Sequence, residues 1–269
     1  MSEDSSLRAY DRLADRVQQH RQAVKGPVLV VEGPNDRNTL RGLLPGVTIF
    51  PADGRRNALE QSRRLYEWSA EKWACVVDLD FDDEVAEYDL GKHLHPYHGA
   101  DLEAMLITLG VLHDLLSHLG SDDKITREGG PDAVVNLLCG VVTGIASLRE
   151  RNASEGWGLP FDEVPIEGKI DRRTLQLNVR GYCTALRPRS GSVELSLLIE
   201  TMNGQPGGAN KFSGKDVIAA AAVALRNRVG SLSKDQASVE VLLSALRASC
   251  TWRLSRSEWL SQLKSILEA

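Results

Sequence analysis

The chain has 269 residues, 42% of them hydrophobic, so it can bury a substantial core in one large domain or two smaller ones. Its formal net charge of -5 argues against attachment to nucleic acid by overall positive charge, although a local basic face is compatible with it. The beginning, MSEDSSLRAYDRL, is acidic and polar, and we find no uninterrupted apolar run that would span a bilayer, so we expect a cytoplasmic protein without membrane contact.

Segments rich in β-branched residues alternate with segments of helical periodicity in the first part of the chain. The predicted strands are 28–32, 47–50 and 74–80, with a further edge strand at 92–98, and the predicted helices are 6–24, 36–44 and 58–72. The edge position follows from Pro96, which cannot donate to a central ladder. This alternation predicts an α/β fold, a parallel sheet flanked by helices, with functional groups at the carboxyl ends of the strands.

The remaining sequence is mainly helical. Apolar residues recur at helical spacing in 100–120, 131–153, 213–229, 238–250 and 255–269. We therefore expect three parts: an N-terminal helix at 1–26, an α/β domain at 27–110 and a mainly α-helical C-terminal domain at 111–269. The four cysteines (Cys75, Cys139, Cys183 and Cys250) form no Cys-x-x-Cys pair and are expected to be buried thiols.

Two of the predicted strands end in carboxylates. Glu32 ends the strand in VLVVEGPND, and Asp78 and Asp80 end the strand in WACVVDLDFDDE. A charge at such a position must be solvated, paired or bound to a metal. Crowded carboxylates suit a hard cation such as Mg²⁺ or Mn²⁺, provided that the backbone leaves strand geometry between Asp78 and Asp80. The alternative is a solvated acidic loop, with Asp36 as a helix-capping acid.

These motifs resemble a known family. VVEGPND followed by VVDLDFD resembles the TOPRIM fold, whose signature is a strand-end Glu-Gly with a following Asp, and then a strand-end Asp-x-Asp. The resemblance covers roughly residues 27–109. Among TOPRIM proteins, the chain is most similar to stand-alone nucleases with a helical C-terminal part, the AriB type of the PARIS anti-phage systems in the OLD-like group. HGADLEAML and NKFSGKDVIAAAAVAL resemble further motifs of that group more loosely.

The resemblance implies a Mg²⁺-dependent endonuclease that hydrolyses phosphodiester bonds in DNA or RNA, including tRNA. It implies that Glu32, Asp78 and Asp80 bind the metal, which is Mg²⁺ or Mn²⁺. Asp36, one helical turn beyond Glu32, and Glu103 are expected to complete a second metal site and to be catalytic as well. For Glu103 the alternative is an exposed helix acid.

Basic residues are the expected contacts to the substrate. Arg55 and Arg56 lie in the loop after the second strand, on the same carboxyl-end side as the acids, and Lys215 lies beside a predicted helix N-terminus, which suits phosphate. The alternative is that all three belong to an ordinary solvated surface. Asp101 precedes Glu103 and either assists at the metal or caps the helix.

No G-x-x-x-x-G-K-[ST] loop occurs in the sequence, so any dependence on ATP would come through a partner. The resemblance accordingly implies the toxic effector of an anti-phage defence system, controlled by an ATPase encoded nearby. The competing hypothesis is a non-cleaving TOPRIM module that docks to an ATPase or to nucleic acid.

Two apolar helix faces leave the oligomeric state open. VIAAAAVAL presents small residues, and EWLSQLKSILEA carries an apolar stripe formed by Trp259, Leu260, Leu263, Ile266 and Leu267. These faces either pack inside the chain or form a homodimer through the helical C-terminal part.

Overall fold

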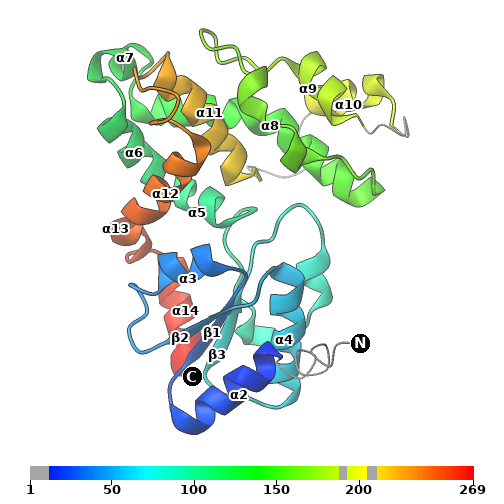
Figure 1. The fold of residues 1–269 in the computed structure, drawn as a ribbon, viewed down its shortest axis with the longest axis vertical. Helices are drawn as coiled ribbons and strands as arrows, with labels where there is room; N and C mark the ends of the chain where they lie inside the picture. Colours follow the sequence, from blue (N-terminus) through cyan, green and yellow to red (C-terminus); the bar gives the residue numbers. More distant parts are fainter. Residues whose placement is uncertain (1–11, 188–192, 205–210) are drawn as a thin grey trace, which may run out of the picture. The chain divides into compact units, whose positions relative to one another are not determined.

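The computed structural model describes residues 12–187, 193–204 and 211–269 (Figure 1). The chain divides into two compact units. Unit 1 comprises Met1–Leu79, Asp83–His98 and Thr251–Ala269, and unit 2 comprises Asp80–Asp82 and Gly99–Cys250. The first predicted helix, 6–24, is observed as α2, Leu13–Ala23, and its beginning lies outside the described residues.

Unit 1 contains a three-stranded parallel sheet of order β2-β1-β3. The strands are β1 (Val28–Val31), β2 (Thr48–Pro51) and β3 (Trp73–Val76), and the helices around them are α2, α3 (Pro34–Leu40), α4 (Arg55–Glu67), α13 (Thr251–Leu254) and α14 (Glu258–Glu268). All residues of β1 are fully buried. Burial on both faces is typical of a parallel sheet covered by helices on both sides, so the predicted α/β class is confirmed.

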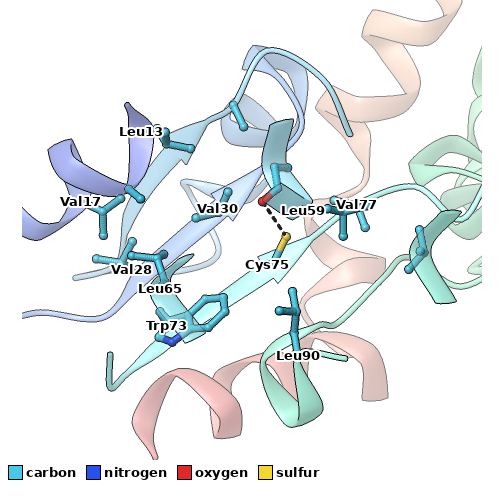
Figure 2. Close-up of a cluster of buried hydrophobic side chains, with 14 residues drawn as sticks. Leu13, Val17, Val28, Val30, Leu59, Leu65, Trp73, Cys75, Val77 and Leu90 are labelled. Atoms are coloured by element: carbon cyan, nitrogen blue, oxygen red, sulfur yellow. Dashed lines mark hydrogen bonds between the residues drawn. The ribbon is translucent and has the colours of Figure 1, made fainter. Parts of the chain in front are cut away.

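The core of unit 1 lies between this sheet and helices α2 and α4. Figure 2 shows Val28 and Val30 of β1 and Cys75 of β3 on the same sheet face as Leu59 and Leu65 of α4. The alternation of strand residues turns every second side chain to this face. On the other side of the sheet, α14 packs against β3 (Figure 1).

The predicted fourth strand at 92–98 is wrong. A 3₁₀ turn, Gly91–His93, occupies the beginning of this segment, and one isolated parallel bridge joins Cys75 to Leu94. The backbone N–H groups of His95 and Tyr97 still donate to carbonyls of Cys75 and Val77, at 2.9 and 3.1 Å. The segment therefore covers the edge of β3 without forming a regular strand.

Unit 2 is helical. Its helices are α5 (Leu102–Thr108), α6 (Val111–Leu119), α7 (Asp122–Arg127), α8 (Pro131–Glu155), α9 (Val179–Leu186), α10 (Leu195–Asn203), α11 (Gly214–Arg226) and α12 (Val239–Ser249), with short 3₁₀ turns at Phe161–Glu163 and Ile166–Lys169. Helix α11 packs against α5, α8 and α12, and every residue from Val217 to Leu225 is buried.

The units differ from the three parts predicted at 1–26, 27–110 and 111–269. Helix α2 packs against α4, and α14 packs against β3, so both chain ends belong to unit 1. Helix α5 already belongs to unit 2. The reason is that the apolar stripe of α14 covers the sheet, a pairing that no local sequence pattern reports.

Both apolar faces that suggested a homodimer are buried within the chain. The alanines of α11 lie in the core of unit 2, and Trp259, Leu260, Leu263 and Leu267 of α14 are buried in unit 1. The prediction of a dimer through these faces thereby loses its basis, and the intramolecular alternative accounts for both.

Within the described residues, the 25-residue helix α8 is long and apolar enough to cross a membrane by length and composition, and the bent pair α5–α6 passes the same test as one span. This differs from our expectation from sequence. The finding is weak evidence for a membrane span, because core helices meet the same criterion, and α8 packs against α6, α10 and α11.

Three of the four cysteines are buried as expected. Cys75, Cys183 and Cys250 are buried, Cys139 is half-buried, and none of the four forms a disulfide. Burial raises the pKa of the Cys75 thiol to about 12 and those of the other three to about 11, which keeps them protonated near neutral pH.

Replacement of Gly214 tests the close contact between α5 and α11. A Cβ atom at Gly214 would collide with the backbone of Glu103 and Ala104. We expect Gly214→Ala to lower the free energy of unfolding by about 1–3 kcal/mol, as measured by denaturant titration. Gly140→Ala is the matched control, since nothing lies within 4 Å of the new Cβ, and it should be neutral or stabilising. Equal effects of the two substitutions would contradict the contact.

Candidate functional site

Two of the predicted acids meet at the carboxyl edge of the sheet in unit 1. Val31 pairs with Val76, so β1 and β3 end at the same level. The chain continues to Glu32 and Asp78, and Oε1 of Glu32 accepts a hydrogen bond from the backbone N–H of Asp78 at 2.6 Å. The ends of two strands are therefore joined through a candidate catalytic side chain.

Asp36 lies at the same edge of the sheet, and we call Glu32, Asp36 and Asp78 together the acidic corner. Asp36 lies in the first turn of α3, which begins after the N-cap Gly33 and has Pro34 at its first position. Oδ2 of Asp36 accepts from the backbone N–H of Gly33 at 2.9 Å, the reciprocal arm of a capping box. The alternative, that Asp36 is a helix-capping acid, is thus confirmed. It does not exclude the predicted binding of a cation, because a carboxylate oxygen can accept more than one interaction.

Tyr97 and Trp259 support Asp36, and our sequence reasoning missed both. The hydroxyl of Tyr97 donates to Oδ1 of Asp36 at 2.9 Å. The fully buried Tyr97 ring stacks on Trp259 of α14 with 5.2 Å between the ring centroids. The Trp259 indole N–H donates to the carbonyl of Pro96 at 2.9 Å, and the ring of His95 bonds the carbonyl of Trp259 at 2.9 Å. Helix α14 therefore supports the Asp36 carboxylate indirectly, through the stacking of Trp259 on Tyr97.

No local signal identifies these two aromatic residues. In the sequence, Trp259 is one member of an apolar stripe, and Tyr97 is part of the predicted edge strand. Burial lowers the pKa of His95, which favours the neutral ring, and the contacts of this ring with Trp259 give it a structural role.

Asp80 lies where the backbone has left strand geometry. Its φ is 43°, and its N–H donates to the carbonyl of Ala100 at 2.7 Å. The turn that our metal hypothesis required after Asp78 is therefore present. Asp80 belongs to unit 2 and Asp78 to unit 1, and their shared binding of one ion stays a prediction.

Glu103 occupies a different environment from the one predicted. Its side chain is 4% exposed and accepts from Nε of Arg247 at 2.7 Å, so the alternative of an exposed helix acid is wrong. A cation at Glu103 would have to compete with this half-buried guanidinium. Its role at a second metal site also stays a prediction.

Asp101 caps α5, as one alternative held, and also binds the beginning of α11. Its carboxylate accepts from the N–H of Ala104 at 2.7 Å, the N–H of Gly214 at 3.0 Å and the hydroxyl of Ser213 at 3.0 Å. Burial and the nearby negative charge of Glu103 raise the pKa of Asp101 to about 6, against the lowering effect of these hydrogen bonds.

The predicted substrate contacts differ in their surroundings. Arg55 at the start of α4 forms an ion pair with Glu84 at 2.9 Å and is 13% exposed, whereas Arg56 is 79% exposed and pairs with Glu60 at 3.3 Å. Their loop lies at the acidic edge, since the N–H of Gly54 donates to the carbonyl of Glu32 at 2.9 Å. Lys215 is exposed in the first turn of α11, in unit 2.

The acidic corner offers the right chemical groups for a hard cation, although they are not arranged around one position. Glu32, Asp36 and Asp78 offer the carboxylate oxygens that Mg²⁺ and Mn²⁺ prefer, and hydrogen bonds hold Glu32 and Asp36. Among the residues that the structure describes, however, no three His, Cys, Asp or Glu side chains are already arranged around one metal position.

Comparison with known proteins adds no assignment: family models match no part of the chain, and no curated protein is significantly similar to it.

The raised pKa of Asp101 predicts a pH-dependent stability. Because the folded pKa of about 6 exceeds the ordinary value of about 3.9 for an aspartic acid, the contribution of Asp101 is fully present below about pH 4 and is lost as the pH rises through 6. The loss amounts to roughly 3 kcal/mol. Asp101→Asn cannot ionise. Between about pH 4 and pH 7 we therefore expect the unfolding free energy of the wild type to fall by this amount relative to that of the variant.

Denaturant titrations at a series of pH values measure this difference. Asp123→Asn serves as the control, since Asp123 is an exposed acid of the same unit and its replacement should leave the pH profile unchanged. Parallel profiles for wild type and Asp101→Asn would show that Asp101 is ionised as easily in the folded chain as in the unfolded one.

Proposed function

We propose that this chain is a Mg²⁺-dependent TOPRIM-type nuclease that hydrolyses phosphodiester bonds in DNA or RNA. The observation that supports this proposal is the hydrogen-bonded corner at the carboxyl edge of the parallel sheet, where Glu32 and Asp78 follow neighbouring strands. Asp36 is fixed beside them by Gly33 and Tyr97. Acids placed in this order at the ends of β1 and β3 are what the sequence resemblance to TOPRIM enzymes implies.

Glu32, Asp36 and Asp78 of unit 1 would hold the ion. The further metal-binding roles predicted from the sequence for Asp80 and Glu103 concern residues of unit 2, and Glu103 would first have to release its guanidinium partner. When bound, Mg²⁺ or Mn²⁺ supplies Lewis-acid stabilisation of the charge that develops on the phosphate oxygens. The protein itself fixes the direction of the carboxylates. The N–H of Gly33 and the phenol of Tyr97 do this for Asp36, and the N–H of Asp78 does it for Glu32.

Basic residues of the same edge would orient the substrate. Arg56 is exposed at the start of α4 and can contact a phosphate, whereas Arg55 is engaged with Glu84 and would position the acidic segment after β3. The phosphate contact predicted from the sequence at Lys215 concerns unit 2 and the first turn of α11. These roles are proposals for binding rather than for the chemical step.

The biological role proposed here rests on the sequence resemblance alone. Stand-alone nucleases of the AriB type suggest the toxic effector of an anti-phage system that an ATPase partner controls. The missing phosphate-binding loop fits an effector that does not hydrolyse ATP itself.

A non-cleaving binding module is the second candidate. The observation that favours it is the absence of a ready three-ligand metal arrangement among the described parts of the chain, together with the hydrogen bonds that already hold Asp36. In this case the acidic corner would stabilise the strand ends, and the same scaffold would dock to an ATPase or to nucleic acid.

Cleavage assays on Glu32→Gln distinguish the two candidates. The glutamine keeps Oε1 as the acceptor for Asp78 and removes one metal-binding charge, so the fold should persist. We expect wild type to cut DNA or RNA with Mg²⁺ or Mn²⁺ and not with EDTA, and Glu32→Gln to lose at least about 100-fold in rate, a loss typical of removing one electrostatic contact to the reacting group.

Glu87→Gln is the matched control, because Glu87 is an exposed acid of the same unit. It should cut like wild type. Cleavage that survives EDTA or Glu32→Gln would contradict the proposed metal site. Absence of any cleavage in the presence of the partner ATPase, with no rise of melting temperature on adding Mn²⁺, would favour the binding module.

Tyr97→Phe tests whether the phenol positions Asp36. The substitution keeps the stacked ring and removes the hydrogen bond, so we expect a loss of about 10-fold or more in Mn²⁺ affinity, the effect usual for a group that orients a ligand. Calorimetric titration with Mn²⁺ measures this without any cleavage. Tyr66→Phe, at an exposed tyrosine of α4, should bind Mn²⁺ like wild type. Equal affinities in Tyr97→Phe and wild type would leave Tyr97 a packing residue only.

A further inference from the structure

Trp252 is the most exposed large hydrophobic side chain among the described residues. Its exposed fraction is 58%, whereas Trp73 and Trp259 in the same unit are 0% and 1% exposed. An exposed indole gains little from the hydrophobic effect, because most of its apolar surface stays in water. Most of the ring surface is therefore open to a ligand.

Two arginines lie against this indole. The guanidinium carbon of Arg256 is 4.3 Å from the ring centroid and that of Arg253 is 5.1 Å from it, both within the range of a cation–π interaction. Arg256 is itself exposed, so the planar guanidinium and the indole present a joint aromatic and cationic surface. We call Trp252, Arg253 and Arg256 the Trp252 platform.

The backbone below the platform is firmly held. Leu254, within the same turn of chain, is fully buried and anchors it. The hydroxyl of Ser255 donates to the carbonyl of Trp252 at 2.9 Å, and Ser257 caps α14 by accepting from the N–H of Leu260 at 3.2 Å. A surface fixed in this way loses little conformational entropy when a ligand binds to it.

The chemistry of the platform fits one class of ligand. A flat π surface accepts a stacked base, and guanidinium groups at its margin bind phosphate oxygens, the combination by which proteins hold unpaired nucleic acid. Double-stranded nucleic acid keeps its bases stacked on one another and would offer only phosphates. An acidic peptide would use the charges but would leave the indole without a planar partner.

We propose that the Trp252 platform binds single-stranded nucleic acid by stacking one base on Trp252 and its guanidinium partners and by pairing a phosphate with Arg256. This inference deepens the proposed nuclease function, since it names unpaired strands as the preferred substrate class. Binding to the platform does not need the acidic corner and can be measured without cleavage.

Fluorescence anisotropy of the full-length protein with labelled single-stranded DNA and RNA oligonucleotides, in EDTA, tests the proposal. We expect Trp252→Ala to weaken binding by about 5- to 100-fold and Trp252→Phe to restore part of the loss. Trp68→Ala is the matched control, because Trp68 is 42% exposed on the same unit and should have no effect. Melting curves verify that each variant is folded.

The dependence on salt provides a second measurement. Arg256→Gln should reduce the slope of log affinity against log salt concentration by about 0.7, the value for one phosphate contact on a single strand. Arg63→Gln, at an exposed arginine of α4, should leave the slope unchanged.

Three results would overturn the proposal: equal affinity of wild type and Trp252→Ala, a preference for duplex over single strands, or tighter binding of an acidic peptide than of the oligonucleotide. Failure of the nuclease function gives a different pattern. In that case the wild type would bind single strands through Trp252 and would not cut them with Mg²⁺ or Mn²⁺.

Discussion

The parallel pairing of β1 with both of its neighbours is the constraint on which the candidate site depends. Its register pairs Val31 with Val76, so two strands end together and the following residues emerge at one edge. The complete burial of β1 admits no charged side chain before the strand ends. Glu32 therefore stands at the first position where a carboxylate can meet solvent, a backbone N–H group or a cation.

The acids of the chain are held by different donors. Glu32 accepts from the backbone N–H of Asp78, and Asp36 accepts from the backbone N–H of Gly33 and from the phenol of Tyr97. Glu103 and Asp216 are bound by the guanidinium groups of Arg247 and Arg149, which offset their charge. A cation that approached Glu103 or Asp216 would have to displace a guanidinium partner.

The packing of unit 2 depends on one close contact between two helices. Helices α5 and α11 approach so closely that only a residue without a side chain fits at Gly214, and the Asp101 carboxylate joins the beginnings of both helices. The burial that makes this contact effective also makes the charge on Asp101 costly, which is why its pKa is raised. The Asp101 carboxylate thus stabilises the packing of α5 against α11, and its contribution to stability is smaller at neutral pH than at acidic pH.

The sequence by itself determined the α/β class, the positions of β1, β2 and β3, the strand-end acids Glu32 and Asp78 and the cap at Asp101, because these follow from periodicity and from residues adjacent in the chain. Only the tertiary structure decided that Arg247, 144 residues away, binds Glu103, and that α14 supports Asp36 through Trp259 and Tyr97. The edge segment at 92–98 and the division into units were likewise settled by packing. The physical reason is that burial and charge pairing depend on which distant surfaces meet, and local spacing carries no record of that choice.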